Sequence, residues 1–235
     1  MKNIILIGFY FLIFVSKGQQ IISGSVIYKL KSKQESNEKF DDIIKLGRTA
    51  RDNQQFELLF SSNESIFLQI NELQSDLNPD EIKLFKNFYS KNFYVFSENK
   101  IVLEQVELDN KKYLLKKNLN YTWNLTNETK VIGLYNCFKA ITYKEIYRDN
   151  TIKKIPIVAW YCPEIPFGFG PKNYFGLPGL ILELHDSNVV FYASKLNFDL
   201  SFKNKKLPSL VGEEKSLEEL KLIQENIKKK YFLNE

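Results

Sequence analysis

The sequence predicts a mainly β protein, an antiparallel curved sheet or half-open barrel with a few short helices and an amphipathic C-terminal helix. Three observations predict this class. Short runs rich in β-branched and aromatic residues recur along the chain and are separated by turn residues at close intervals. Hydrophobic residues make up 44% and aromatic residues 14% of the 235 residues, which is enough for a folded core. A helical period is clear only near the C-terminus.

Residues 1–18 are expected to be a cleavable secretory signal. Lys2 supplies the positive charge, residues 4–15 form an apolar run, and Ser16 and Gly18 are small residues at the positions that a signal peptidase reads. The run is shorter than the roughly 20 residues of a membrane-spanning helix, which argues against an uncleaved signal anchor. No Cys follows it, which excludes a lipobox anchor. We expect the remaining 19–235 to be a single exported domain.

Composition excludes several classes of partner. The formal net charge is +5, and the only clusters of basic residues, at 203–206 and 228–230, are interpreted as solvated lysines rather than a nucleic-acid site. No apolar run after the signal is long enough to span a membrane. The chain has two Cys and a single His, His185, too few ligands for a closed zinc site. We therefore expect no cofactor, no metal and no nucleic acid.

The first elements of the mature chain are expected to form an antiparallel meander. In residues 22–30, apolar and polar residues alternate as in a half-buried strand. The polar residues 61–64 separate two apolar runs and predict a hairpin loop. The other strands expected in this half are residues 56–60, 65–70, 93–96, 101–108, 113–115 and 121–125.

Three helices are expected. Residues 36–47 carry apolar side chains on one side, and residues 78–89 begin with a cap residue, a proline and two acids. Residues 216–231 begin with a capping box formed by Ser216 and Glu219, and their apolar residues recur at spacings of three and four. We expect this last stripe to dock on the rest of the domain rather than on a membrane, because its length is ordinary for a surface helix.

A long hairpin is expected on either side of residues 149–150, Asp and Asn, which suit a two-residue turn. With that turn, Cys137 lies directly opposite Cys162. Directly opposed residues of two strands are close enough for a disulfide, and an even number of Cys in an exported protein favours one. The alternative is a catalytic pair of free thiols, but no His lies nearby in the sequence to activate a thiolate.

After the hairpin, the composition changes sharply. The chain has 10 Gly and 7 Pro, and eight of these lie in residues 163–179. Such a segment cannot be a regular strand or helix, so we expect an ordered irregular loop. Four aromatic residues are interleaved with the Gly and Pro and are expected to anchor the loop against the sheet. We call residues 163–179 the Pro/Gly segment.

A six-residue motif, Gly176-Leu177-Pro178-Gly179-Leu180-Ile181, begins at the end of this segment. It resembles the signature of the GLPGLI family of exported Bacteroidetes proteins. The resemblance covers residues 121–197 and implies an exported, β-rich domain of undefined role. It also implies the periplasm as the compartment, with secretion as the alternative, and a TonB-dependent outer-membrane transporter as a neighbour. Other parts of the pattern match in order and spacing: Tyr135-Asn136-Cys137-Phe138-Lys139-Ala140, Ala159-Trp160-Tyr161, Glu164-Ile165-Pro166, Gly170-Pro171 and Tyr174.

The motif and its surroundings allow two interpretations. In the first, they are a folding device, a sharp corner where small residues are needed and where Leu177, Leu180 and Ile181 return the chain to the core. In the second, the Pro/Gly segment is a rigid rim that presents side chains to a ligand or partner. The candidate binding residues are then Tyr161, Glu164, Phe167, Phe169, Lys172 and Tyr174.

Function is expected to be binding rather than catalysis. The chain has neither a Gly-x-Ser-x-Gly elbow nor a phosphate loop. His185 beside Asp186 is interpreted as a surface histidine near a turn. A carboxylate pair such as Glu164 and Glu183 would suit glycoside hydrolysis only at a separation that the sequence does not give.

The leading hypothesis is a binding module for a lipid or other apolar ligand held inside the curved sheet. The alternative is an accessory interaction protein of an outer-membrane transport complex. A large enclosed apolar cavity favours the first hypothesis. A solid core with an exposed aromatic patch at residues 167–175 favours the second.

Overall fold

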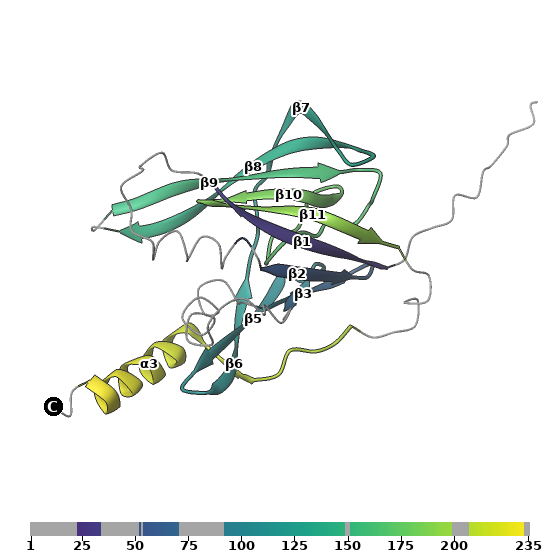
Figure 1. Cartoon of the computed structure of the whole chain (residues 1–235). Coiled ribbons are helices and arrows are strands. Elements are labelled where there is room, and N and C mark those ends of the chain that lie inside the picture. Colours follow the sequence, from purple (N-terminus) through teal and green to yellow (C-terminus); the bar gives the residue numbers. More distant parts are fainter. Residues whose placement is uncertain are drawn as a thin grey trace, which may run out of the picture.

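The computed structural model describes residues 23–33, 52, 54–70, 92–148, 151–198 and 207–232. They form one curved sheet of twelve strands that does not close into a barrel, with a helix beside it (Figure 1). The predicted mainly β, antiparallel fold is confirmed. The expected signal, 1–18, and the expected helices, 36–47 and 78–89, lie outside the described residues.

Two antiparallel meanders make up the sheet, and the first strand joins them. β1 pairs with β2 on one side and with β11 on the other. The strand order is β12-β6-β5-β4-β3-β2-β1-β11-β10-β9-β8-β7, and only β12, beside β6, runs parallel to its neighbour. The strands are β1 (Gly24–Ser32), β2 (Gln55–Phe60), β3 (Glu64–Ile70), β4 (Phe93–Phe96), β5 (Ile101–Leu108), β6 (Lys111–Asn118), β7 (Asn124–Ile132), β8 (Tyr135–Arg148), β9 (Thr151–Cys162), β10 (Leu180–Asp186), β11 (Val189–Asn197) and β12 (Glu213–Lys215).

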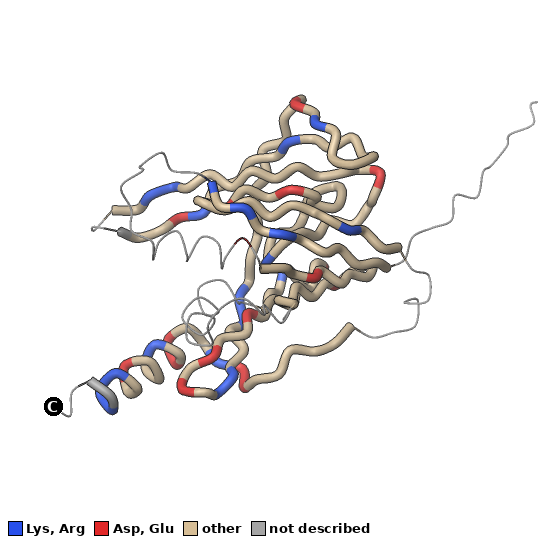
Figure 2. Tube along the Cα trace, in the orientation of Figure 1, with Lys and Arg blue, Asp and Glu red and all other residues tan. Residues whose placement is uncertain are grey.

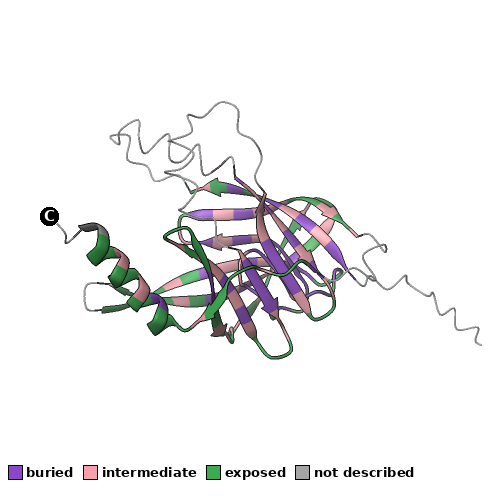
Figure 3. Ribbon diagram, turned by 90° about the horizontal axis from the view of Figure 1, so that it is seen from below, coloured by how far each residue is buried: buried purple, intermediate pink, exposed green. Residues whose placement is uncertain are grey.

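One face of the sheet carries the main core. Its centre is β1, where the alternating residues Val26, Tyr28 and Leu30 are fully buried, as the period-two pattern predicts. On the neighbouring strands, Phe56 and Phe67 stack with their ring centroids 5.1 Å apart. Figure 3 shows buried residues concentrated in the strands of the sheet. The aromatic residues that dominate the composition therefore fill the inside of the curve.

The segment between β6 and β7 does not pair as expected. Residues 121–125 were predicted to be a strand, but β7 begins only at Asn124. Tyr121 and Trp123 pack instead against Tyr174 of the Pro/Gly segment, with ring centroids 5.1 and 6.3 Å from it. Packing of these rings against the inside of the curve outweighs the β propensity of the residues.

The C-terminal helix α3 (Leu217–Phe232) begins as the sequence predicts. The Glu219 backbone N–H donates to Ser216 Oγ at 3.2 Å, and the Ser216 N–H donates to Glu219 Oε2 at 2.7 Å, which is a complete capping box. The helix contacts the sheet mainly through Leu220 and Ile223, whereas Leu217 is 48% exposed. Charges of both signs follow each other along it (Figure 2). None of the helical residues described forms a segment with the length and hydrophobicity needed to span a bilayer.

The β8–β9 hairpin has the predicted register. Arg148 lies opposite Thr151, and the pairing continues without a shift to Phe138 opposite Tyr161. The hairpin extends past both of its neighbours, because β7 pairs with β8 only up to residue 141 and β10 pairs with β9 only from residue 157. We call the projecting residues 142–148 and 151–156 the β8–β9 ribbon.

Candidate functional site

The Pro/Gly segment runs from the end of β9 to the start of β10 and is irregular, as predicted. It forms hydrogen bonds within itself and with β10. The Gly176 N–H donates to the Gly168 carbonyl at 2.8 Å, and the Ile181 N–H donates to the Phe169 carbonyl at 2.9 Å. Trp123 Nε1 donates to the Phe175 carbonyl at 2.9 Å. The segment is therefore a compact unit fixed from both sides.

The aromatic candidate residues lie in the core. Tyr161, Phe167, Phe169 and Tyr174 are all buried. Phe167 packs on Phe60 of β2 with ring centroids 4.8 Å apart. Because a half-open sheet leaves its inner face uncovered, these rings supply the missing layer. The exposed aromatic patch that would mark an interaction surface at 167–175 is not present in this fully described segment.

The motif forms a tight corner at the end of the segment. A Cβ on Gly179 would lie 2.2 Å from the carbonyl oxygen of Cys162, and Gly176 has a φ of +90°. Glycine avoids both problems because it has no Cβ. Leu177, Leu180 and Ile181 are buried as predicted, whereas Pro178 is exposed. This packing supports the interpretation of the motif as a folding device.

The two remaining candidate residues do not join the buried rings. Glu164 is exposed. Lys172 instead binds Asp186, with Nζ 2.5 Å from Oδ2, and Lys144 of β8 binds the other carboxylate oxygen of Asp186. Burial by itself raises the pKa of Asp186, but the two ammonium groups outweigh it and lower this pKa below its ordinary value. Lys172 therefore ties the Pro/Gly segment to the sheet.

Glu183 and His185 lie on the opposite face of β10 from the core. His185 Nε2 is 2.6 Å from Glu183 Oε1, and Lys130 Nζ is 2.6 Å from Glu183 Oε2. Burial raises the pKa of Glu183, but hydrogen bonds from His185 and Lys130 reverse the effect and lower it overall. A general acid of a glycosidase needs a raised pKa. The surroundings of Glu183 lower its pKa instead.

Cys137 and Cys162 continue the β8–β9 register by one position, as predicted, and both are buried. They are free thiols in hydrogen-bond contact with each other, so the expected disulfide is not formed in this structure. Burial raises the pKa of Cys137 to about 12 and also raises that of Cys162. A catalytic pair needs a thiolate, which these surroundings disfavour.

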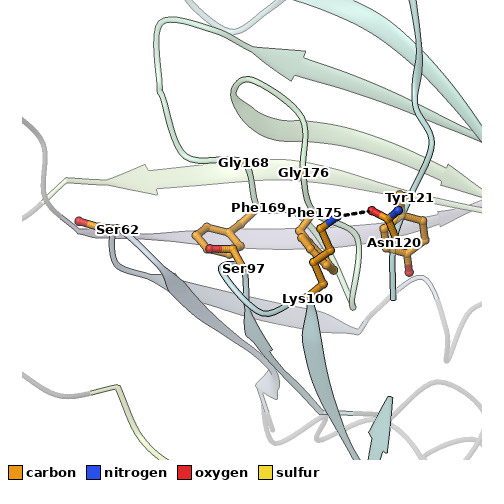
Figure 4. Close-up of a pocket in the computed structure, with 9 residues that line it drawn as sticks. All are labelled: Ser62, Ser97, Lys100, Asn120, Tyr121, Gly168, Phe169, Phe175 and Gly176. Atoms are coloured by element: carbon orange, nitrogen blue, oxygen red, sulfur yellow. Dashed lines mark hydrogen bonds between the residues drawn. The ribbon is translucent and has the colours of Figure 1, made fainter. Parts of the chain in front are cut away.

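A cleft opens at one end of the strands, beside the Pro/Gly segment. Its first cavity has a volume of about 390 Å³ (Figure 4). Lys100 Nζ donates to Asn120 Oδ1 at 2.9 Å across it. The remaining wall combines two serine hydroxyls with aromatic rings and two glycines: Ser62, Ser97, Tyr121, Gly168, Phe169, Phe175 and Gly176.

A second cavity of about 400 Å³ adjoins the first, and Ser62 lines both. The turn after β2 and the turn after β4 form its walls, joined by a 2.9 Å hydrogen bond from the Ser97 N–H to the Asn63 carbonyl. The other residues that line it are Ser61, Glu64, Phe96, Glu98 and Asn99. We call the two cavities together the rim cleft.

The sequence predicted only part of the rim cleft. Phe169 and Gly176 belong to the Pro/Gly segment that it indicated, whereas the serine, asparagine and lysine residues of the turns had no pattern that marked them as a site. Ser62, Ser97 and Asn120 come from three loops far apart in the chain. Only the sheet order brings these loops to one end of the molecule.

One family model matches part of the chain, and two solved structures have a similar fold. The model, described as "Protein of unknown function (Porph_ging)", matches residues 146–183, from the end of β8 to β10. No curated protein matches the chain. Two solved structures are similar, "Structure of PNGF-II in C2 space group" and "Structure of PNGF-II in P21 space group", with TM-scores of 0.52 and 0.51.

The likeness to PNGF-II is one of fold. Sequence identity is 16% in both cases, and each alignment covers 86% of this chain. The chain spans 32% of the length of one solved chain and 33% of the other. The same curved sheet therefore occurs as one part of a longer protein.

Proposed function

We propose that this chain is an exported, non-catalytic binding protein that holds a small ligand in the rim cleft. The observation that carries the proposal is the cleft itself, built from turns of one meander and from the Pro/Gly segment of the other. Its walls are fixed by backbone hydrogen bonds and by the aromatic core beneath them. A preformed site of this kind orders few side chains when a ligand binds.

The lining indicates a ligand with hydrogen-bonding groups rather than a purely apolar one. The inside of the curve, where a lipid was expected, is filled by aromatic rings from the strands and the Pro/Gly segment. In the rim cleft, hydroxyl and amide groups alternate with Phe and Tyr rings. A bare acyl chain would leave these polar groups without partners, which costs free energy.

Two features support a non-catalytic role. The carboxylate of Glu183 is held ionised by His185 and Lys130, and the thiol of Cys137 has a raised pKa.

Native mass spectrometry of the protein purified from its own host tests the cleft. We expect a bound small molecule on the wild-type protein. Ser62→Trp enlarges the side chain that lines both cavities and should weaken binding by about tenfold, a loss of about 1.4 kcal/mol. Ser209→Trp is the matched control, because Ser209 is exposed and lines neither cavity. Equal ligand masses on the two variants would rule out the cleft as the site.

The proposal includes that the chain is exported and that it is a member of the GLPGLI family. The motif at residues 176–181 lies almost at the end of the matched region, 146–183. In the periplasm, thiol oxidation would convert the contact between Cys137 and Cys162 into a disulfide.

The redox state of the two Cys gives a testable consequence. Protein prepared from the periplasm without reductant should show no free thiols after denaturation. The disulfide should add about 3 kcal/mol to the free energy of unfolding in urea, because it restricts the unfolded chain. In a Cys162→Ala control, reductant should have no effect on stability. Two free thiols in the periplasmic protein would contradict the prediction.

A second candidate, an accessory protein of an outer-membrane transport complex, is favoured by one observation. The β8–β9 ribbon projects beyond the sheet with Tyr143 59% and Ile152 65% exposed. Exposed apolar side chains on a projecting hairpin are suited to contact with another protein. The resemblance to GLPGLI proteins is what suggests a TonB-dependent transporter as that partner.

A further inference from the structure

The two cavities of the rim cleft are lined by charges of opposite sign. Lys100 lines the first cavity and extends beside Phe175 toward Asn120 (Figure 4). Glu64 and Glu98 line the second cavity. The turn of residues 97–100 contributes to both cavities, so the lysine and the carboxylates belong to one continuous wall.

None of these three charges has a charged partner among the described residues. Lys100 donates to the amide oxygen of Asn120. Glu98 Oε1 accepts a hydrogen bond from Asn63 Nδ2 at 2.6 Å, and Glu64 Oε2 accepts one from Tyr94 OH at 2.8 Å. The cleft therefore keeps one ammonium group and two carboxylates available to a ligand.

Two carboxylates elsewhere in the structure are neutralised by neighbouring cations. Asp186 has two lysine partners, and Glu183 has Lys130 and His185. A hydrogen bond in which one group is ionised is roughly twice as strong as a neutral one. Opposite charges in two adjoining cavities also fix the direction in which a ligand lies. These charges thus favour a ligand that is positive at one end and negative at the other.

Resting on the proposed function, we infer that the ligand is a short peptide with free ends. Its α-amino group binds at Glu64 and Glu98, and its α-carboxylate binds at Lys100. Each cavity lies within the range of about 300–1,000 Å³ typical of small-ligand sites, so the pair suits several residues rather than one amino acid. Phe169 and Phe175, which line the same cavity as Lys100, provide an apolar wall for the last side chain.

Isothermal titration calorimetry with a defined peptide tests the inference. The probes are the tripeptide Ala-Ala-Phe, its N-acetyl form and its C-terminal amide, with maltotriose as a neutral polar probe. We expect the free tripeptide to bind and each blocked form to bind about tenfold more weakly, because one charge-assisted contact is lost. Maltotriose should not bind.

Variants assign each end of the peptide to its side chains. In Glu98→Gln, combined with Glu64→Gln, the N-acetyl and free forms should bind equally. In Lys100→Gln, the amide and free forms should bind equally. Lys116→Gln is the matched control, because Lys116 is exposed on β6 and lines neither cavity. Circular dichroism verifies that each variant is folded.

The outcomes separate this inference from the proposed function. Equal binding of free and blocked peptides to the wild-type protein, or no binding of any of them, overturns the peptide inference. Binding of maltotriose in place of the peptide also overturns it. In each of these cases the proposed function stands if the native ligand mass is still lost in Ser62→Trp. Absence of a Ser62-dependent ligand overturns the proposed function itself.

Discussion

Replacement of Gly179 with alanine is expected to lower the free energy of unfolding by about 3 kcal/mol, at the upper end of what overpacking usually costs. The new Cβ would lie 2.2 Å from the Cys162 carbonyl oxygen and 2.5 Å from its carbon. These are backbone atoms at the end of β9, so no side chain can move aside. Urea unfolding followed by circular dichroism measures the effect.

Gly176→Ala is the matched control within the same motif. Gly176 has a φ of +90°, but apart from its two neighbours in the chain no residue has an atom within 4 Å of the position of its Cβ. Its replacement therefore carries only conformational strain, about 1–2 kcal/mol. If Gly179→Ala were as stable as the wild-type protein, or less damaging than Gly176→Ala, the motif would not be the tight corner described above.

Replacement of Asp186 with asparagine is expected to cost about 3 kcal/mol at pH 7, because it removes one partner of a buried ion pair. Asp186 is only 4% exposed and binds both Lys144 and Lys172. The variant leaves two partly buried ammonium groups without a counter-charge. Glu145→Gln is the control. Its pair with Lys154 is largely exposed, so its loss should cost below about 1 kcal/mol.

The pH dependence of the same pair isolates the charge of Asp186. The pKa of Asp186 in the folded protein is lowered from the usual value of 3.8. The stability that its ionised carboxylate contributes is therefore complete above pH 3.8 and is lost as the pH falls through the folded pKa. The stability difference between wild type and Asp186→Asn should therefore be constant near neutral pH and shrink below about pH 4. A difference that stays the same at pH 2 would show that charge is not its cause.

Local patterns predicted the elements that depend on neighbouring residues. The capping box at Ser216, the alternation in β1 and the β8–β9 register all match the structure. The register followed from a single assumption about the turn at residues 149–150. The resemblance also pointed to the motif, whose glycines prove to be required by close packing and by a positive φ.

Long-range packing explains what the sequence could not predict. Phe167 and Tyr174 were candidates for ligand binding, but the open curve of the sheet needs them as core. Lys144 lies 42 residues from Asp186, and no local pattern links the two. The rim cleft combines turns that become neighbours only through the strand order. Residues in turns have no periodicity that would reveal a shared site.

The central claim is that the rim cleft binds the ligand. Its most direct test is native mass spectrometry of the protein purified from its own host, with a variant of the β8–β9 ribbon measured beside Ser62→Trp. Tyr143→Ser combined with Ile152→Ser removes the exposed apolar side chains of the β8–β9 ribbon. If the rim cleft is the binding site, the ligand mass persists in this variant and is lost in Ser62→Trp. A ligand lost from the ribbon variant but kept by Ser62→Trp would contradict the account, and so would a wild-type protein that carries no ligand.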